Sequence, residues 1–514
     1  MAGMNSRLAF AIISSACWSA FQHGYNTGVL NAPQAVMSEW LQKEVLTGTN
    51  TSLAAKDDPK VTTVMSIAVA IYCVGGMIGG IITGVVADRF GRKGGLLWNN
   101  ALVFAAALLE GLAKTANSAE MLILGRLLIG VNSGLNAGLA PMYLAEISPV
   151  SLRGSIGTVY QLVITMTILL SQVLGLESVL GTPEGWPYLL AATAIPAVLQ
   201  IFTLPVCPES PKFLLLNKGQ ELHAQRALNW LRGDVAVHGE MEEMHQEAEK
   251  NKISKKVTLR ELFSNRQLRQ PLLIAMVVMV AQQFSGINAV IFFSTDIFTR
   301  VKLTTSQSQY ATLGMGAMNV VMTVISLLLV ERAGRKTLLL SGFAGMFVCS
   351  VGLVSCMGAM NVVMTVISLL LVERAGRKTL LLSGFAGMFV CSVGLVVAYM
   401  YAHISWVSYL CIGLVILFVV MFAVGPGSIP WFLVTELFNQ SSRPAATSVA
   451  VTVNWTANFI VGLSFLQLSI ALGANVFIIF AVLQLIFIFF IFFKVPETKN
   501  KTVEEITAMF RQQM

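Results

Sequence analysis

The 514-residue sequence contains few charged residues. Its 34 Lys and Arg and 26 Asp and Glu make up 12% of the chain, against about 25% in typical soluble domains. Because 55% of the residues are apolar, a water-soluble chain of this length could not solvate its surface. This composition excludes ordinary soluble, disordered and nucleic-acid-binding proteins. The net charge of +8 indicates basic anchors on the cytosolic side of a membrane rather than a nucleic-acid partner.

Residues for metal and enzymatic chemistry are also scarce. The five His and seven Cys are scattered along the chain, so they form neither a metal-ligand cluster nor a disulfide framework. The sequence has no nucleotide-binding loop and no spacing typical of a catalytic triad. We therefore expect no enzyme, no metal site and no cofactor.

Long uncharged stretches are frequent instead. A membrane span needs about 20 mostly apolar residues. The first stretch is too long for a cleavable signal peptide and is predicted to be the first span. The last two stretches are each long enough for two spans, and 337–372 is long enough for two minimal spans, which predicts about 14 spans in an all-α polytopic membrane protein. The stretches are 8–38, 61–87, 94–113 (interrupted by Glu110), 127–145, 154–176, 185–208, 271–295, 303–330, 337–372, 379–435 and 444–493.

The polar segment 208–270 divides the chain. We expect an N-terminal six-helix bundle over 1–207, a cytosolic linker with short helices over 208–270, a C-terminal bundle over 271–493 and a tail over 494–514. The basic loops place both termini in the cytosol and loop 39–60 outside. That loop contains Asn50 in an Asn-Thr-Ser sequon, which predicts N-glycosylation there.

Residues 315–354 and 357–396 are identical. Structural repeats usually diverge, so this identity indicates a very recent duplication, an unusual transcript or an assembly error. The duplication adds two spans and therefore preserves the sidedness of all later segments. We expect a core of twelve helices to use 303–330 and about 380–402, leaving 338–372 as a peripheral transmembrane hairpin. The alternative arrangement uses the second copy for both positions.

A second repeat relates the two halves of the chain. Asp-Arg-Phe-Gly-Arg-Lys (88–93) corresponds to Glu-Arg-Ala-Gly-Arg-Lys (331–336), and each half also has a Glu-x6-Arg pair. Such half-repeats are typical of transporters. We expect these charges to pair across neighbouring helix ends and to close the cytosolic side in one state, although they could also serve only as membrane anchors. The predicted network comprises Arg92, Glu146, Arg153, Glu331, Arg335, Glu436 and Arg443.

Several further motifs resemble one transporter family. They are Gly-Arg-Lys (91–93), Pro-Glu-Ser-Pro-Lys (208–212), Gln-Gln-Phe-Ser-Gly-Ile-Asn (282–288), Gly-Pro-Gly (425–427), Pro-Trp (430–431) and Pro-Glu-Thr-Lys (496–499). Together they are similar to the sugar porter family of the major facilitator superfamily, and in particular to its animal facilitative glucose transporters (GLUT type). The resemblance implies two six-helix bundles with a hexose held between them near the membrane midplane. It also implies alternating access and a plasma-membrane location.

The resemblance also implies the residues of the sugar site. Amide and indole groups suit a sugar because they donate and accept hydrogen bonds and offer an aromatic surface. Amides are costly in lipid unless they are partnered, although a single one could simply join two helices. Phe292 and Phe293 match the family's outer gate, and Pro426 and Pro430 would let the tenth span bend. The implied sugar contacts are Gln161, Gln282, Gln283, Asn288, Asn319 (duplicated as Asn361), Trp431 and Asn458.

The sequence departs from the family pattern in ways that bear on substrate and energy source. Met279-Val280-Ala281 is similar to members that also accept fructose, so strict glucose selectivity is not implied. Ala423 replaces an acidic residue of the tenth span. Asn26 stands where proton-coupled relatives carry Asp, and an amide cannot exchange a proton near neutral pH. We expect a hexose uniporter, and the alternatives are a proton-linked symporter, a non-transporting sugar sensor and a product inactivated by the repeat.

Overall fold

The computed structural model describes residues 5–46, 54–149, 153–233, 237–253, 257–331, 377–401, 403–427, 429–438 and 442–497. The chain divides into two compact units, Met1–Lys255 (unit 1) and Lys256–Met514 (unit 2), and each is described by itself. The regular secondary structure of the described ranges is entirely helical. This confirms the all-α class that the sequence predicts.

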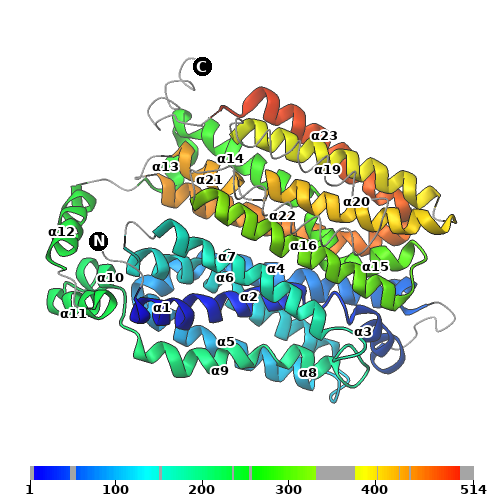
Figure 1. Cartoon of the computed structure of the whole chain (residues 1–514), viewed down its shortest axis with the longest axis horizontal. Coiled ribbons are helices and arrows are strands. Elements are labelled where there is room, and N and C mark those ends of the chain that lie inside the picture. The colour runs from blue at the N-terminus through cyan, green and yellow to red at the C-terminus, as the bar shows by residue number, and fades with distance from the viewer. Residues whose placement is uncertain are drawn as a thin grey trace. The chain divides into compact units, whose positions relative to one another are not determined.

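Unit 1 contains long helices with shorter ones between them, and it ends with three helices of the polar segment (Figure 1). Its first long stretch is interrupted by a π-helical turn at Ile13–Cys17. The helices are α1 (Ser6–Ile12), α2 (Trp18–Gly28), α3 (Gln34–Trp40), α4 (Pro59–Phe90), α5 (Arg92–Leu112), α6 (Ala119–Ile147), α7 (Arg153–Leu174), α8 (Trp186–Ala191), α9 (Ala194–Thr203), α10 (Pro211–Leu216), α11 (Glu221–Arg232) and α12 (His238–Ile253).

Local sequence signals explain where α4 begins and ends. The Asp58 carboxylate accepts a hydrogen bond from the Lys60 N–H at 2.9 Å, and Pro59 occupies the first helical position. The helix ends at Phe90, and Gly91 follows with a φ of 81°. Arg92 then begins α5. The basic motif at 88–93 is therefore a tight turn between two membrane-length helices.

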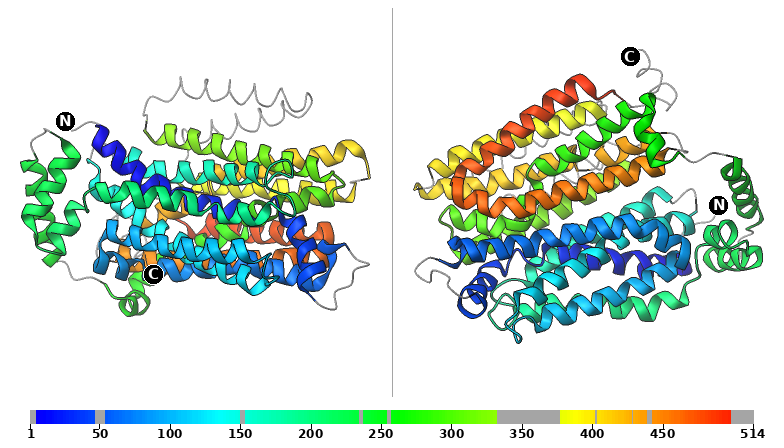
Figure 2. Two further views of the ribbon diagram at one scale, coloured as in Figure 1. Left: turned by 90° about the horizontal axis from the view of Figure 1, so that it is seen from below. Right: turned by 180° about the vertical axis from the view of Figure 1, so that it is seen from behind.

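The short helices α10–α12 gather at one end of the long helices of unit 1, near the N-terminus (Figures 1 and 2). Specific hydrogen bonds attach them there. The Arg232 side chain donates to the Ile147 carbonyl at the end of α6 at 2.8 Å. The Asn5 amide donates to the Leu231 carbonyl at 2.9 Å. Arg232 also forms an ion pair with Glu240, so one buried cation links α6, α11 and α12.

Unit 2 is a second bundle with an apolar core. Met279, Leu381, Phe385, Leu433 and Phe487 pack together in that core. The helices are α13 (Leu259–Ser264), α14 (Arg266–Phe284), α15 (Ile287–Arg300), α16 (Thr305–Glu331), α19 (Arg377–Met400), α20 (Ser405–Val424), α21 (Ile429–Leu437), α22 (Arg443–Leu472) and α23 (Val476–Lys494).

Nine helical segments within the described ranges are long and apolar enough to cross a membrane. One of them runs through α14 and α15, and Val159–Leu174 is a shorter apolar helix. These segments support a multi-pass membrane protein. The predicted hairpin at 338–372 lies outside the described residues, so the predicted number of about 14 spans stays a prediction. The nine segments are Pro59–Phe90, Arg92–Leu112, Ala119–Ile147, Trp186–Val206, Gln267–Arg300, Lys378–Met400, Trp406–Trp431, Ala445–Leu472 and Val476–Lys494.

Candidate functional site

A cluster of amide side chains lies inside unit 2, where the end of α14 meets α22. The Asn454 amide nitrogen donates to Gln282 Oε1 at 2.8 Å, and Gln283 Nε2 donates to Asn454 Oδ1 at 2.9 Å. The Asn288 amide donates to Gln283 Oε1. All but Asn288 are at least nine-tenths buried. The structure thus joins Gln282, Gln283 and Asn288 into one network and places Asn454 at its centre.

A broken helix lies against this cluster. The expected bend is present: α20 ends at Val424, Gly425–Gly427 form a turn, and α21 begins at Ile429. A broken helix leaves carbonyl groups without intrahelical partners. The Gln282 amide nitrogen donates to two of them, Pro426 O and Gly427 O, at 2.8 Å each. Gln282 therefore stabilises the break directly.

The remaining predicted sugar contacts of unit 2 lie on neighbouring helices. Trp431 is 41% exposed in the first turn of α21, where Pro430 is buried. Asn319 is half-buried on α16. Asn458 is half-buried on α22, and its Oδ1 atom is buried without a hydrogen-bond partner in the described part of the chain. An amide oxygen left in this way is an acceptor available to a hydroxyl group.

The predicted gate residues Phe292 and Phe293 are buried in α15. Phe293 departs from helical geometry, with φ −130° and ψ 19°. Its ring stacks on Phe465 at 5.4 Å between centroids and meets the Phe292 ring edge-on at 6.2 Å. Both rings are therefore packed within unit 2 in this state, at a local irregularity of the helix.

Unit 1 contains a buried amide network that the sequence analysis did not anticipate. Gln22 Nε2 donates to Asn100 Oδ1 at 2.9 Å, and Asn100 Nδ2 donates to Gln200 Oε1 at 3.0 Å. Asn136 Nδ2 donates to Gln22 Oε1 at 3.0 Å. These bonds join α2, α5, α6 and α9. The predicted Gln161 lies apart from them, exposed on α7.

The charge motif of unit 1 forms a connected cluster. Arg92 donates to Glu146 Oε1 from Nη2 at 2.9 Å and from Nε at 3.1 Å, and Ser210 donates to the same carboxylate. Glu209 accepts the backbone N–H groups of Arg92 and Lys93 at 3.1 and 3.0 Å. Its carboxylate therefore sits at the N-terminus of α5, where the helix dipole favours an anion.

Unit 2 repeats part of this arrangement. The Lys378 backbone N–H at the start of α19 donates to Glu497 Oε2 at 3.2 Å. Glu497 belongs to Pro-Glu-Thr-Lys, as Glu209 belongs to Pro-Glu-Ser-Pro-Lys. The predicted Arg335 and Asn50 lie outside the described residues. Arg153, Glu331, Glu436 and Arg443 lie on described helices, but their side chains are outside the described part.

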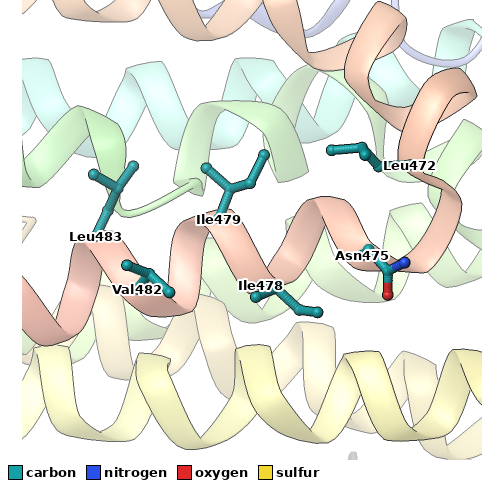
Figure 3. A pocket seen from close by; sticks show the side chains of 6 residues that line it. All are labelled: Leu472, Asn475, Ile478, Ile479, Val482 and Leu483. Atoms are coloured by element: carbon teal, nitrogen blue, oxygen red, sulfur yellow. The ribbon is translucent and has the colours of Figure 1, made fainter.

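An apolar groove lies elsewhere on unit 2, along the end of α22 and the first half of α23 (Figure 3). Its lining is aliphatic apart from one amide, and it contains none of the predicted sugar contacts. In the described residues no group of three or more His, Cys, Asp or Glu side chains could hold a metal ion. The lining residues of the groove are Leu472, Asn475, Ile478, Ile479, Val482 and Leu483.

Comparison with known proteins identifies the family. Residues 12–357 and 354–510 match the family described as "Sugar (and other) transporter". The chain is 44% identical over 511 residues to facilitated glucose transporter member 3 of solute carrier family 2 from Canis lupus familiaris, covering 98% of this chain and 93% of that protein. It is 43% identical over 513 residues to member 1 from Gallus gallus, covering 99% and 94%.

Solved structures show the same fold. The xylose transporter XylE from E. coli in a partially occluded inward-open conformation gives a TM-score of 0.72 at 22% identity, covering 97% of this chain and 100% of that one. Its inward-open conformation also gives 0.72, at 23% identity, covering 97% and 99%. The fold, the relatives and the family match agree, and this chain belongs to the sugar transporter family.

Proposed function

We propose that this protein is a facilitative hexose uniporter, which carries glucose, and also fructose, down its gradient by alternating access. The observation that carries the proposal is the amide cluster of Gln282, Gln283, Asn288 and Asn454 beside the broken helix. Buried amides in a membrane protein are costly unless they are partnered, and several of them gathered at one place are typical of a polar cavity. The names of the relatives, facilitated glucose transporters, support a hexose as that ligand.

Uniport is favoured over proton-linked symport by the first long helix. Asn26 is buried, and its amide donates to Thr193 Oγ1 at 2.7 Å and to the Gln22 carbonyl at 2.8 Å. An amide with these partners has a structural role and no proton to exchange. The cytosolic charges, with Arg92 paired to Glu146, would hold the cytosolic side closed in one state and separate in the other.

The proposal includes the placement of the chain in the membrane. We propose a plasma-membrane protein with both termini in the cytosol, a glycan on Asn50, and an extra hairpin from the repeat that gives about 14 spans. Two-span insertion is compatible with this topology because it leaves every later loop on its original side.

Uptake of labelled sugar into vesicles tests the function. We expect uptake of glucose and fructose that does not change when a proton gradient is imposed. Gln283→Ala should reduce it, whereas Gln270→Ala, an exposed amide in the first half of the same helix, should not. Gradient-driven accumulation would instead show a symporter. Sugar binding without uptake would show a sensor. Uptake only by a chain lacking 315–356 would show that the repeat inactivates the protein.

A further inference from the structure

The duplication gives every residue of 315–354 an identical twin 42 positions later. A single transport core cannot use both members of a pair in the same place. Two described helices contain duplicated residues, α16 and α19. The question is which member of each pair belongs to the core.

The helix α16 contains the start of the first copy. Its residues 305–314 precede the duplication and occur once in the sequence. Thr312 in this unique part lies 3.1 Å from both Ser294 Oγ and Thr295 Oγ1 of α15. The helix continues without a break to Glu331 and also contacts α20. The asparagine that it carries into unit 2 is Asn319, the first member of the Asn319/Asn361 pair.

The helix α19 contains the end of the second copy. Its Tyr399 lies beyond the duplication, and the hydroxyl donates to the Ile297 carbonyl at 2.9 Å. Ser392 donates to Gln484 Oε1 of α23 at 3.1 Å. Leu381 and Phe385 are fully buried. The second member of each of these pairs therefore packs in unit 2.

The contact between α19 and the broken helix is especially close. A Cβ atom added to Gly384 would lie 2.4 Å from Pro426 Cδ, and one added to Gly425 would lie 2.2 Å from the Leu380 carbonyl oxygen. Both distances are far below van der Waals contact. Small residues permit such close approach of helix backbones in membranes. Since protein interiors are close-packed, no second copy of this helix fits the same space.

We propose that the transport core is assembled across the two copies, with Asn319 taken from the first and Gly384, Ser392 and Lys378 from the second. Their twins Asn361, Gly342, Ser350 and Lys336 contribute nothing to transport. The Glu497 carboxylate accepts a hydrogen bond from the Lys378 N–H at the start of α19. This contact also assigns the second copy to the core. The part of the proposal that concerns Asn319 rests on the proposed sugar function.

Deletion cannot test this assignment. Because the copies are identical, removing 315–356 and removing 332–373 give the same sequence. Substitutions in one copy at a time can distinguish the copies, and each has a control with an identical local sequence. We would compare Gly384→Leu with Gly342→Leu, and Asn319→Ala with Asn361→Ala, in the full-length chain.

Two measurements are needed, the melting temperature of the purified protein and sugar uptake per transporter at the membrane. Gly384→Leu should lower the melting temperature and reduce uptake about 10-fold or more because of overpacking. Asn319→Ala should raise the KM for the sugar about 5- to 10-fold, the loss expected for one hydrogen bond, with little change in melting temperature. Gly342→Leu and Asn361→Ala should match the wild type in both measurements.

The opposite pattern, or equal effects of both members of a pair, overturns the proposal. Wild-type protein without any uptake would refute the proposed function but would leave the copy assignment testable. In that case the melting temperatures of Gly384→Leu and Gly342→Leu still decide it, and equal values overturn it.

Discussion

The side chain of Gln282 offers the sharpest test of how the site works. It is 3% exposed and lies at the end of α14. Its amide nitrogen donates to the Pro426 and Gly427 carbonyls, and its oxygen accepts from Asn454 and Gln283. We expect Gln282→Leu to leave an apolar side chain that is one atom shorter and to remove all four hydrogen bonds. The helix break would then lose the donor that satisfies its carbonyls.

The size of the effect follows from these contacts. A buried hydrogen bond contributes about 1 kcal/mol net, and an unsatisfied buried group costs about 1–3 kcal/mol. The four lost bonds therefore predict a loss of about 3–4 kcal/mol or more in the free energy of unfolding. Since the broken helix carries Trp431, we also expect a lower maximal rate of transport, in addition to any change in KM.

The assays are thermal unfolding of the purified protein and uptake as a function of sugar concentration. Gln270→Leu, at an exposed position of the same helix, is the control. Gln282→Leu should lower the melting temperature by several degrees even without sugar. If it leaves the melting temperature unchanged and only raises KM, Gln282 acts as a sugar ligand alone, and the inference that it stabilises the break is wrong.

Four shorter predictions follow from other residues. Arg92→Ala should lower the free energy of unfolding by about 3 kcal/mol and impair uptake, because it leaves Glu146 without its cation. Adding Glu146→Gln to this variant should recover part of the lost stability. Glu110→Gln should raise the melting temperature, because Glu110 is fully buried on α5 and neither carboxyl oxygen has a hydrogen-bond partner in the described ranges. Asn458→Ala should raise KM without a matching loss of stability, because the Asn458 Oδ1 atom has no hydrogen-bond partner to lose in the described ranges. Asn50→Gln should abolish a glycan-dependent shift in gel mobility, and an unchanged mobility would show that the site is not used.

Apolar length predicted the helices well. The uncharged stretch 61–87 corresponds to α4 at Pro59–Phe90, and the stretch 94–113 to α5 at Arg92–Leu112. A break was predictable where Gly and Pro coincide, as at Gly425–Gly427, because Pro removes a helical hydrogen bond and Gly destabilises the interior of a helix. The π-helical turn at Ile13–Cys17 has no such signal. It interrupts a stretch that by composition alone is one continuous span.

The amide network of unit 1 shows what composition and spacing cannot supply. Gln22, Asn100 and Gln200 are far apart in sequence, and each by itself could serve as a link between two helices. Their partnership depends on which helices are neighbours, which is tertiary information. Asn454 is different, since it lies four residues before Asn458 and therefore on the same helix face. That spacing could have added Asn454 to the predicted site.

The paired acidic motifs have a common physical explanation. Each unit begins a membrane helix with basic residues, Arg92-Lys93 on α5 and Arg377-Lys378 on α19. Such charges are typical of the boundary of a membrane span, but they are unfavourable at a helix N-terminus because the helix dipole is positive there. Glu209 and Glu497 each place a carboxylate on the exposed N–H groups of that same turn. In each half of the chain a carboxylate therefore offsets both the cations and the positive end of the helix dipole, which gives the acidic and basic motifs one shared physical role.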